Sequence, residues 1–128
     1  MIAALLAGAA LSWGTLPSAP LERSEVAAAR FGNFIYVVGG FEPTRTSPAV
    51  ARHDIRHRLW KSVRSMPLAV NHPSAVAYGG DLYVRGGYAA NLGLGGAALG
   101  RRVFAIAGGP TPGFTFTRTI EFLDVPPR

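Results

Sequence analysis

Two histidines in this sequence have a spacing that could support metal binding. His53 and His57 lie four positions apart, as two metal ligands do on one face of a helix in zinc proteases. The segment between them has an aspartate where that motif has a general-base glutamate, and its pattern is that of a strand and a turn. We therefore expect a surface hairpin here and no metal site.

A glycine cluster, Gly93-Leu94-Gly95-Gly96, resembles a phosphate-binding loop. The dinucleotide motif places such a loop between a strand and a helix, whereas Val103–Ala107 has the pattern of another strand. The sequence also contains no cysteine, which removes disulfides, thiolate metal ligands and cysteine nucleophiles. We expect no cofactor.

The charge of the chain does not favour a nucleic-acid partner. The formal net charge is +6 over 128 residues. Lys61 is the single lysine among the 13 basic residues, and the others are arginines. The arginines are scattered, and their densest run, residues 52–64, also holds apolar residues in the pattern of one hairpin. We expect a solvated basic rim and no nucleic acid as partner.

The first twelve residues are small and apolar. They are too few to cross a bilayer as a helix, which needs about 20 residues. They suit the hydrophobic region of a secretory signal with small residues at Ala7-Gly8-Ala9, although a basic start is missing. This predicts a secreted or periplasmic protein without a membrane span. The alternative is a cytoplasmic protein with a wrongly assigned start or a buried apolar segment.

The sequence repeats itself at a spacing of 47 residues, and this repeat predicts the strands that would position a functional site. Trp13 recurs as Trp60, Pro20 as Pro67, Gly32 as Gly79, Tyr36-Val37 as Tyr83-Val84, and Gly39-Gly40 as Gly86-Gly87. A period of about 40–50 residues with short β segments is typical of propeller blades. One such unit cannot bury both faces of its sheet, so the units must stack.

Glycines and prolines separate the apolar runs, which predicts an all-β chain. Four strands per period are expected, but the third doublet, Gly108-Gly109, follows the second by only 22 residues, so about half a repeat is absent. The expected strands lie near residues 26–29, at 34–38, 50–54, 59–63, 74–78, 82–84, 93–99 and 103–107, and near 119–123.

A hydrophobic strand, a glycine doublet three residues after a tyrosine, and a tryptophan 20 residues after the doublet resemble a kelch repeat. From Trp13 to Val125 the chain is similar to bacterial kelch-motif β-propellers, which are often described as galactose-oxidase-like. The resemblance implies an incomplete propeller of about two and a half blades over residues 13–128, after a signal-like segment at 1–12. Such a propeller needs further blades or self-association. Copper radical oxidation is excluded, because its tyrosine is crosslinked to a cysteine.

Trp13 occupies a fourth-strand position without strands of its own upstream. We therefore expect the segment near Trp13–Leu16 to complete the last blade by pairing with the strand near Thr119–Leu123, because a complementary strand removes an exposed edge. The alternative is that the segment pairs elsewhere, since middle blades are absent.

The loops just ahead of each first strand ring the channel mouth of such a propeller. They supply Arg23, Glu25, Asn71, His72 and Asn91, and Arg85 replaces Val38 beside the second doublet. Donors and acceptors in a ring suit an anionic sugar or a peptide carboxylate. Hydrated loop residues without a ligand are the alternative.

The resemblance implies a non-catalytic binding or scaffold module that recognises a protein or glycan through these loops. Two alternatives stay open. One is a sugar-active enzyme similar to sialic-acid mutarotases, using Arg23, Glu25 and His72. The other is a degenerate remnant without independent function. The sequence defines a scaffold more clearly than a catalytic set.

Overall fold

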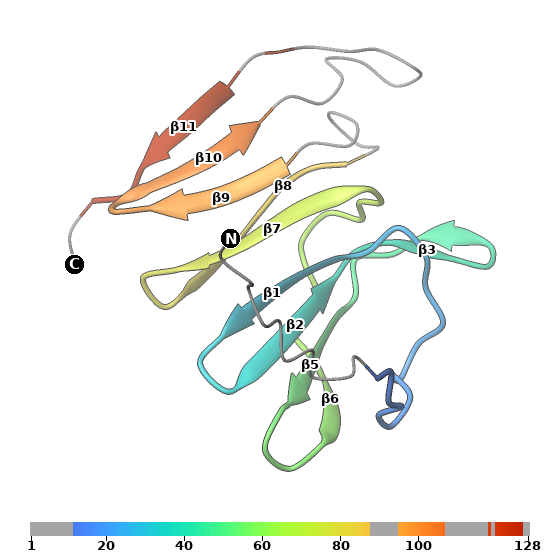
Figure 1. The fold of residues 1–128 in the computed structure, drawn as a ribbon. Coiled ribbons are helices and arrows are strands. Elements are labelled where there is room, and N and C mark those ends of the chain that lie inside the picture. The colour runs from blue at the N-terminus through green and yellow to red at the C-terminus, as the bar shows by residue number, and fades with distance from the viewer. Residues whose placement is uncertain (1–11, 88–94, 107–117, 119, 127–128) are drawn as a thin grey trace, which may run out of the picture.

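A computed structural model describes residues 12–87, 95–106, 118 and 120–126 of the chain. The regular secondary structure in this part consists entirely of β-strands, and every strand pairing is antiparallel. The all-β prediction is therefore confirmed. Figure 1 shows the strands gathered into separate small sheets that lie one above another.

The first sheet, sheet 1, has four strands in the order β1-β2-β5-β6. A two-residue turn with Gly32 at φ 58° joins β1 to β2, and this left-handed angle suits glycine. Asp54 ends β5, where its carboxylate accepts the backbone N–H groups of Arg56 and His57 at 2.9 and 3.0 Å. The strands are β1 (Ala27–Phe31), β2 (Phe34–Val38), β5 (Val50–Asp54) and β6 (Leu59–Val63).

Two further sheets and a short ribbon complete the described architecture. Sheet 2 pairs β7 (Pro73–Tyr78) with β8 (Asp81–Gly86). Sheet 3 has the order β11-β10-β9, from β9 (Gly95–Leu99), β10 (Arg102–Ile106) and β11 (Ile120–Asp124). The ribbon pairs β3 (Phe41–Glu42) with β4 (Arg45–Thr46). The expected strands are present: those at 34–38, 50–54 and 59–63 have the expected bounds, and the bounds of the others differ by one or a few residues.

The sheets stack through their first strands, because β1 packs against β7 and β7 packs against β9. The buried core lies between sheets 1 and 2. Its centre is Ala27, Val38 and Val50, and Val38 has no exposed surface. Partly buried residues of both sheets pack against it: Tyr36, Val63, Met66, Ala75, Leu82 and Val84.

The second glycine of each doublet makes the same close approach in both repeats. A Cβ on Gly40 would lie 2.5 Å from the carbonyl oxygen of Ser24, and one on Gly87 would lie 2.6 Å from that of Asn71. Both glycines have φ of +97°. The doublet therefore recurs because this backbone contact leaves no room for a side chain.

The predicted pairing of Trp13 with the last strand is wrong. Among the described residues, β11 pairs only with β10, and residues 12–17 belong to no strand. The N-terminal segment is held by sheet 1 instead, because the Trp60 indole N–H donates to the carbonyl of Pro17 at 2.8 Å. Trp13 itself is fully exposed. In the stack of described sheets, sheet 2 lies between sheets 1 and 3, so the N-terminal segment beside sheet 1 is separated from β11 (Figure 1).

Candidate functional site

Glu25 and His72 lie one repeat apart in sequence and meet in space. Their φ angles are 56° and 51°, and the backbone N–H of His72 donates to the carbonyl of Glu25 at 3.0 Å. The side chains also meet, with His72 Nδ1 3.1 Å from Glu25 Oε2. A left-handed backbone costs a residue with a side chain about 1–2 kcal/mol. Such residues are concentrated at functional sites.

Asn71 fixes the orientation of the His72 ring. His72 Nδ1 lies 3.2 Å from the Asn71 side-chain oxygen, while the Asn71 amide donates to Thr46 Oγ1 at 2.8 Å. Asn71 is buried, so these bonds satisfy its polar atoms. Both neighbours of Nδ1 are acceptors, which places the proton on Nδ1 and makes Nε2 of the neutral ring an acceptor for a ligand.

A groove of about 360 Å³ is lined by Glu25, Phe41, Thr46, Asn71 and His72, and we call it the mouth groove. Phe41 is 41% exposed, so a ligand can reach its ring. Two backbone hydrogen bonds between Ser24 and Phe41, of 3.0 and 2.8 Å, tie the β3–β4 ribbon to the segment that precedes β1.

The ribbon is fixed by the carboxylate of Glu42. Its Oε1 accepts from the hydroxyl of fully buried Ser47 at 2.6 Å, and its Oε2 accepts from Arg45 Nε at 2.9 Å. These bonds, with that from Ser47 first, lower the pKa of Glu42 below its ordinary value. An ionised Glu42 therefore holds the wall of the mouth groove that Phe41 and Thr46 form.

Arg23 does not line the mouth groove. Its guanidinium donates to the carbonyls of Gly39 and Ala49 at 2.7 and 2.8 Å, beyond the ends of β2 and β5. Burial lowers the pKa of Arg23, and its Nε has no partner among the described residues. Arg23 thus links the main chain after β2 to the main chain before β5. It also lines a neighbouring hollow, together with Glu22, Ser24, Phe41, Glu42 and Pro43.

The remaining predicted residues lie away from this cluster. Arg85 of sheet 2 forms an ion pair with Glu121, which lies on β11 of sheet 3. Asn91 lies outside the described residues. The structure thus brings together Glu25, Asn71 and His72 and places Arg23 and Arg85 in other roles.

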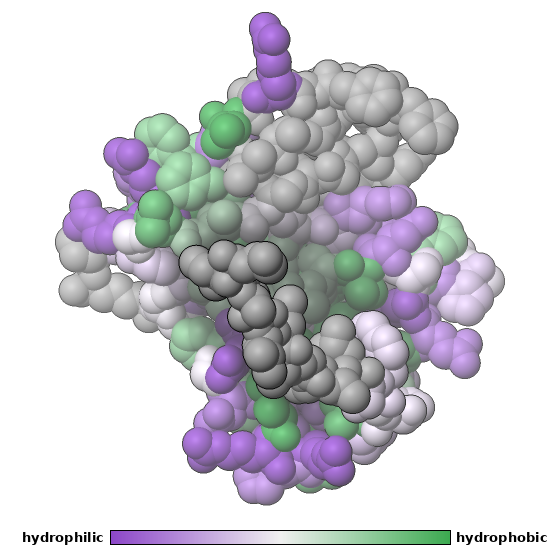
Figure 2. All heavy atoms as spheres, in the orientation of Figure 1, coloured by the Kyte–Doolittle hydropathy of each residue, from purple (hydrophilic) through white to green (hydrophobic). Residues whose placement is uncertain are grey.

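The two histidines of the β5–β6 hairpin do not form a common site. His57 Nδ1 lies 2.9 Å from Asp54 Oδ2, and this contact is the main cause of a lowered pKa of Asp54. His53 is buried, and its ring centroid lies 4.8 Å from that of Trp60. Within the described ranges, no group of three or more His, Cys, Asp or Glu could hold a metal ion. Figure 2 shows hydrophilic side chains along the lower edge of the molecule, where this hairpin lies.

Phe41 and Thr46 were not predicted as site residues. Phe41 did carry a signal, because an aromatic residue follows the glycine doublet in both copies, as Phe41 and Tyr88. Thr46 carried none, because the position one repeat later in the sequence is Gly93.

No protein-family model matches this chain, and a search of curated proteins finds no relative. Over the part of the chain that the structure describes, no helix has the length and hydrophobicity needed to cross a membrane.

Proposed function

We propose that this chain is a non-catalytic binding module of the kelch-repeat β-propeller type that recognises a glycan or protein through the mouth groove. The observation that carries the proposal is the Glu25–His72 pair. Two residues at the same repeat position hold left-handed backbones and converge beside an exposed Phe41 ring. Strained, partnered polar groups next to an accessible ring are typical of a binding site.

The groove has the chemistry to bind a sugar. Each sugar hydroxyl can donate and accept, while the Glu25 carboxylate accepts and His72 Nε2 offers a further acceptor. The Phe41 ring supplies an apolar surface for the face of a sugar ring. Because the Arg23 cation is engaged with main-chain carbonyls, a neutral sugar fits this groove better than the anionic ligand expected from sequence.

The kelch-type architecture is part of the proposal. The repeated glycine contacts of Gly40 and Gly87 and the stacked antiparallel sheets support it. On this view sheet 1 is a complete four-stranded blade, sheets 2 and 3 are partial blades, and further blades or self-association complete the ring. The apolar segment at residues 1–12 supports a secreted or periplasmic location.

One observation favours an enzyme as second candidate. A histidine hydrogen-bonded to a carboxylate can act as a general acid or base, and His72 and Glu25 lie 3.1 Å apart. A sugar-active enzyme of mutarotase type could use this pair, with Arg23 in a supporting role only. Accelerated anomerisation of sialic acid by the purified chain, lost in H72A, would favour this candidate.

A glycan array probed with the full chain and two variants tests the proposed function. The His72→Ala variant removes the group that faces both Glu25 and Asn71, while Arg85→Gln changes a charged residue away from the groove. We expect array binding by the wild type and R85Q and at least tenfold weaker binding by H72A. Equal binding by the wild type and both variants, or no binding by the wild type, would contradict a glycan site in this groove.

A further inference from the structure

Within the part of the chain that the structure describes, strand β8 lacks the neighbour that the repeat provides in sheet 1. There, β2 lies between β1 and β5, whereas β8 pairs with β7 alone among the described residues. Residues 39–72 join β2 to β7 and carry β5 and β6, but only residues 87–94 join β8 to β9. The connection after β8 is therefore too short to supply the next two strands of the repeat.

The main-chain groups along β8 follow the same alternation as those of β2. Both strands follow two-residue turns, and Tyr83-Val84 repeats Tyr36-Val37. In sheet 1, the backbone N–H of Gly39 donates to the carbonyl of Ala49, and that of Ile55 donates to the carbonyl of Asn33. Hydrogen-bonded pairs alternate along an antiparallel ladder, so Val37 and Ala51, which lie between these two bonds, also form a hydrogen-bonded pair through their main chains. By the same alternation, Val84 directs its main-chain groups away from β7.

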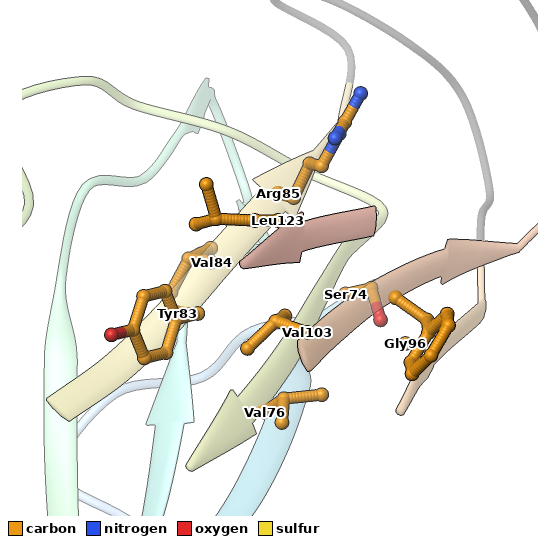
Figure 3. A pocket seen from close by; sticks show the side chains of 9 residues that line it. Ser74, Val76, Tyr83, Val84, Arg85, Gly96, Val103 and Leu123 are labelled. Atoms are coloured by element: carbon orange, nitrogen blue, oxygen red, sulfur yellow. The ribbon is translucent and has the colours of Figure 1, made fainter. Parts of the chain in front are cut away.

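A cavity of about 180 Å³ lies between sheets 2 and 3, next to β8 (Figure 3). In sheet 1, the row Ala27–Val38–Val50 packs the equivalent interface. In sheet 2 that row is reduced to Ser74–Arg85, and both residues line the cavity. The cavity thus lies along the two residues of this row, which Val50 extends in sheet 1. The rest of its lining is largely apolar: Val76, Tyr83, Val84, Gly96, Val103, Phe104 and Leu123.

We infer that the edge of β8 accepts an extended segment of another polypeptide as an added strand. Main-chain bonds give affinity in this mode, and pockets for alternate side chains give specificity. The residue opposite Arg85 is aliphatic and enters the cavity, as Val50 does in the core beside Val38. This surface is separate from the mouth groove and does not depend on the proposed function.

Charge defines a second residue of the partner. In sheet 1, Arg52 lies opposite Tyr36, and its guanidinium stands 4.2 Å above the Phe34 ring. Asp81 occupies the repeat position of Phe34 in β8. A cationic residue opposite Tyr83 therefore lies beside an acidic residue in place of a ring, in addition to the contacts that Asp81 already makes. The partner has an aliphatic residue and, two positions later, an arginine or lysine, as in Val50-Ala51-Arg52.

The probe is a peptide of residues 48–56, which contains the aliphatic and cationic residues at the required spacing. In the folded chain this segment forms β5 and pairs with β2, the strand that corresponds to β8 in the first repeat. The full chain is titrated into the labelled peptide, and fluorescence anisotropy reports binding. Methylation of the Ala51 amide removes a bond to β8, whereas methylation of the Arg52 amide, which faces away from β8, is the matched control. Neither change touches the fold of the protein.

We expect saturable binding that falls at least tenfold with the methylated Ala51 and changes less than about threefold with the methylated Arg52. Absence of saturable binding, or equal loss with both peptides, would overturn the inference. Light scattering on the chain alone provides a second readout. A stable dimer that excludes the peptide would also overturn it, by assigning the edge of β8 to a second copy.

Discussion

The main-chain N–H of His72 donates to the carbonyl of Glu25 at 3.0 Å, while their side chains meet at 3.1 Å. Two residues at equivalent repeat positions are therefore joined through both backbone and side chain. The repeat thus builds the mouth groove directly, because packing β1 against β7 brings the residues ahead of each strand into contact.

The left-handed backbone at His72 predicts an unusual order of stability for two substitutions. Both His72→Gly and His72→Ala remove the half-exposed hydrogen bond between the His72 ring and the Glu25 carboxylate, which contributes about 1 kcal/mol. Only glycine relieves the strain of φ 51°. We expect H72G to be about 1 kcal/mol more stable than H72A in urea denaturation, although glycine is the more flexible residue. The opposite order would contradict the left-handed conformation.

The close approach of the glycine doublet predicts a steep cost at Gly40. Gly40→Ala places a methyl group 2.5 Å from the carbonyl of Ser24 at φ +97°, so the backbone must shift. We expect a loss of more than about 2 kcal/mol in the free energy of unfolding. Gly32→Ala is the control, since its site is open and only φ +58° opposes it, at a cost of about 1 kcal/mol. Equal losses would argue against the contact with Ser24.

Glu42 predicts acid sensitivity that depends on Ser47. The folded protein lowers the pKa of Glu42, mainly through the Ser47 hydroxyl. Its stabilising effect is therefore complete above the unfolded pKa, about 4.3, and is lost as the pH falls through the folded pKa. We expect Ser47→Ala to reduce the difference in Tm between pH 6 and pH 3. Asp54 has a lowered pKa that this substitution leaves in place, so part of the acid effect should persist. An unchanged difference would rule out the Ser47 bond as the cause.

The strands were predictable from sequence because the repeat fixes their order and glycines mark their ends. Val50–Asp54 and Leu59–Val63 have the expected bounds. The position of the N-terminal segment was not predictable, because the bond from the Trp60 indole to Pro17 depends on tertiary packing that no spacing records.

The site was predictable only in part, for a physical reason. Glu25, Asn71 and His72 stand ahead of first strands, so stacking of the sheets brings them together. Arg23 stands in the same loop, but its long side chain reaches the carbonyls of Gly39 and Ala49 instead. The orientation of a flexible arginine depends on the nearest acceptors, and its position in the sequence does not reveal them.

The proposed binding at the mouth groove is tested most directly by ¹H–¹⁵N NMR of the full chain during titration with N-acetylglucosamine and, separately, sialic acid. We expect saturable shifts of the Asn71 side-chain amide and the backbone amides of His72 and Phe41, larger with the neutral sugar, and their loss in H72A. Shifts confined to residues around Arg85, or none with either sugar, would contradict a sugar site in the mouth groove.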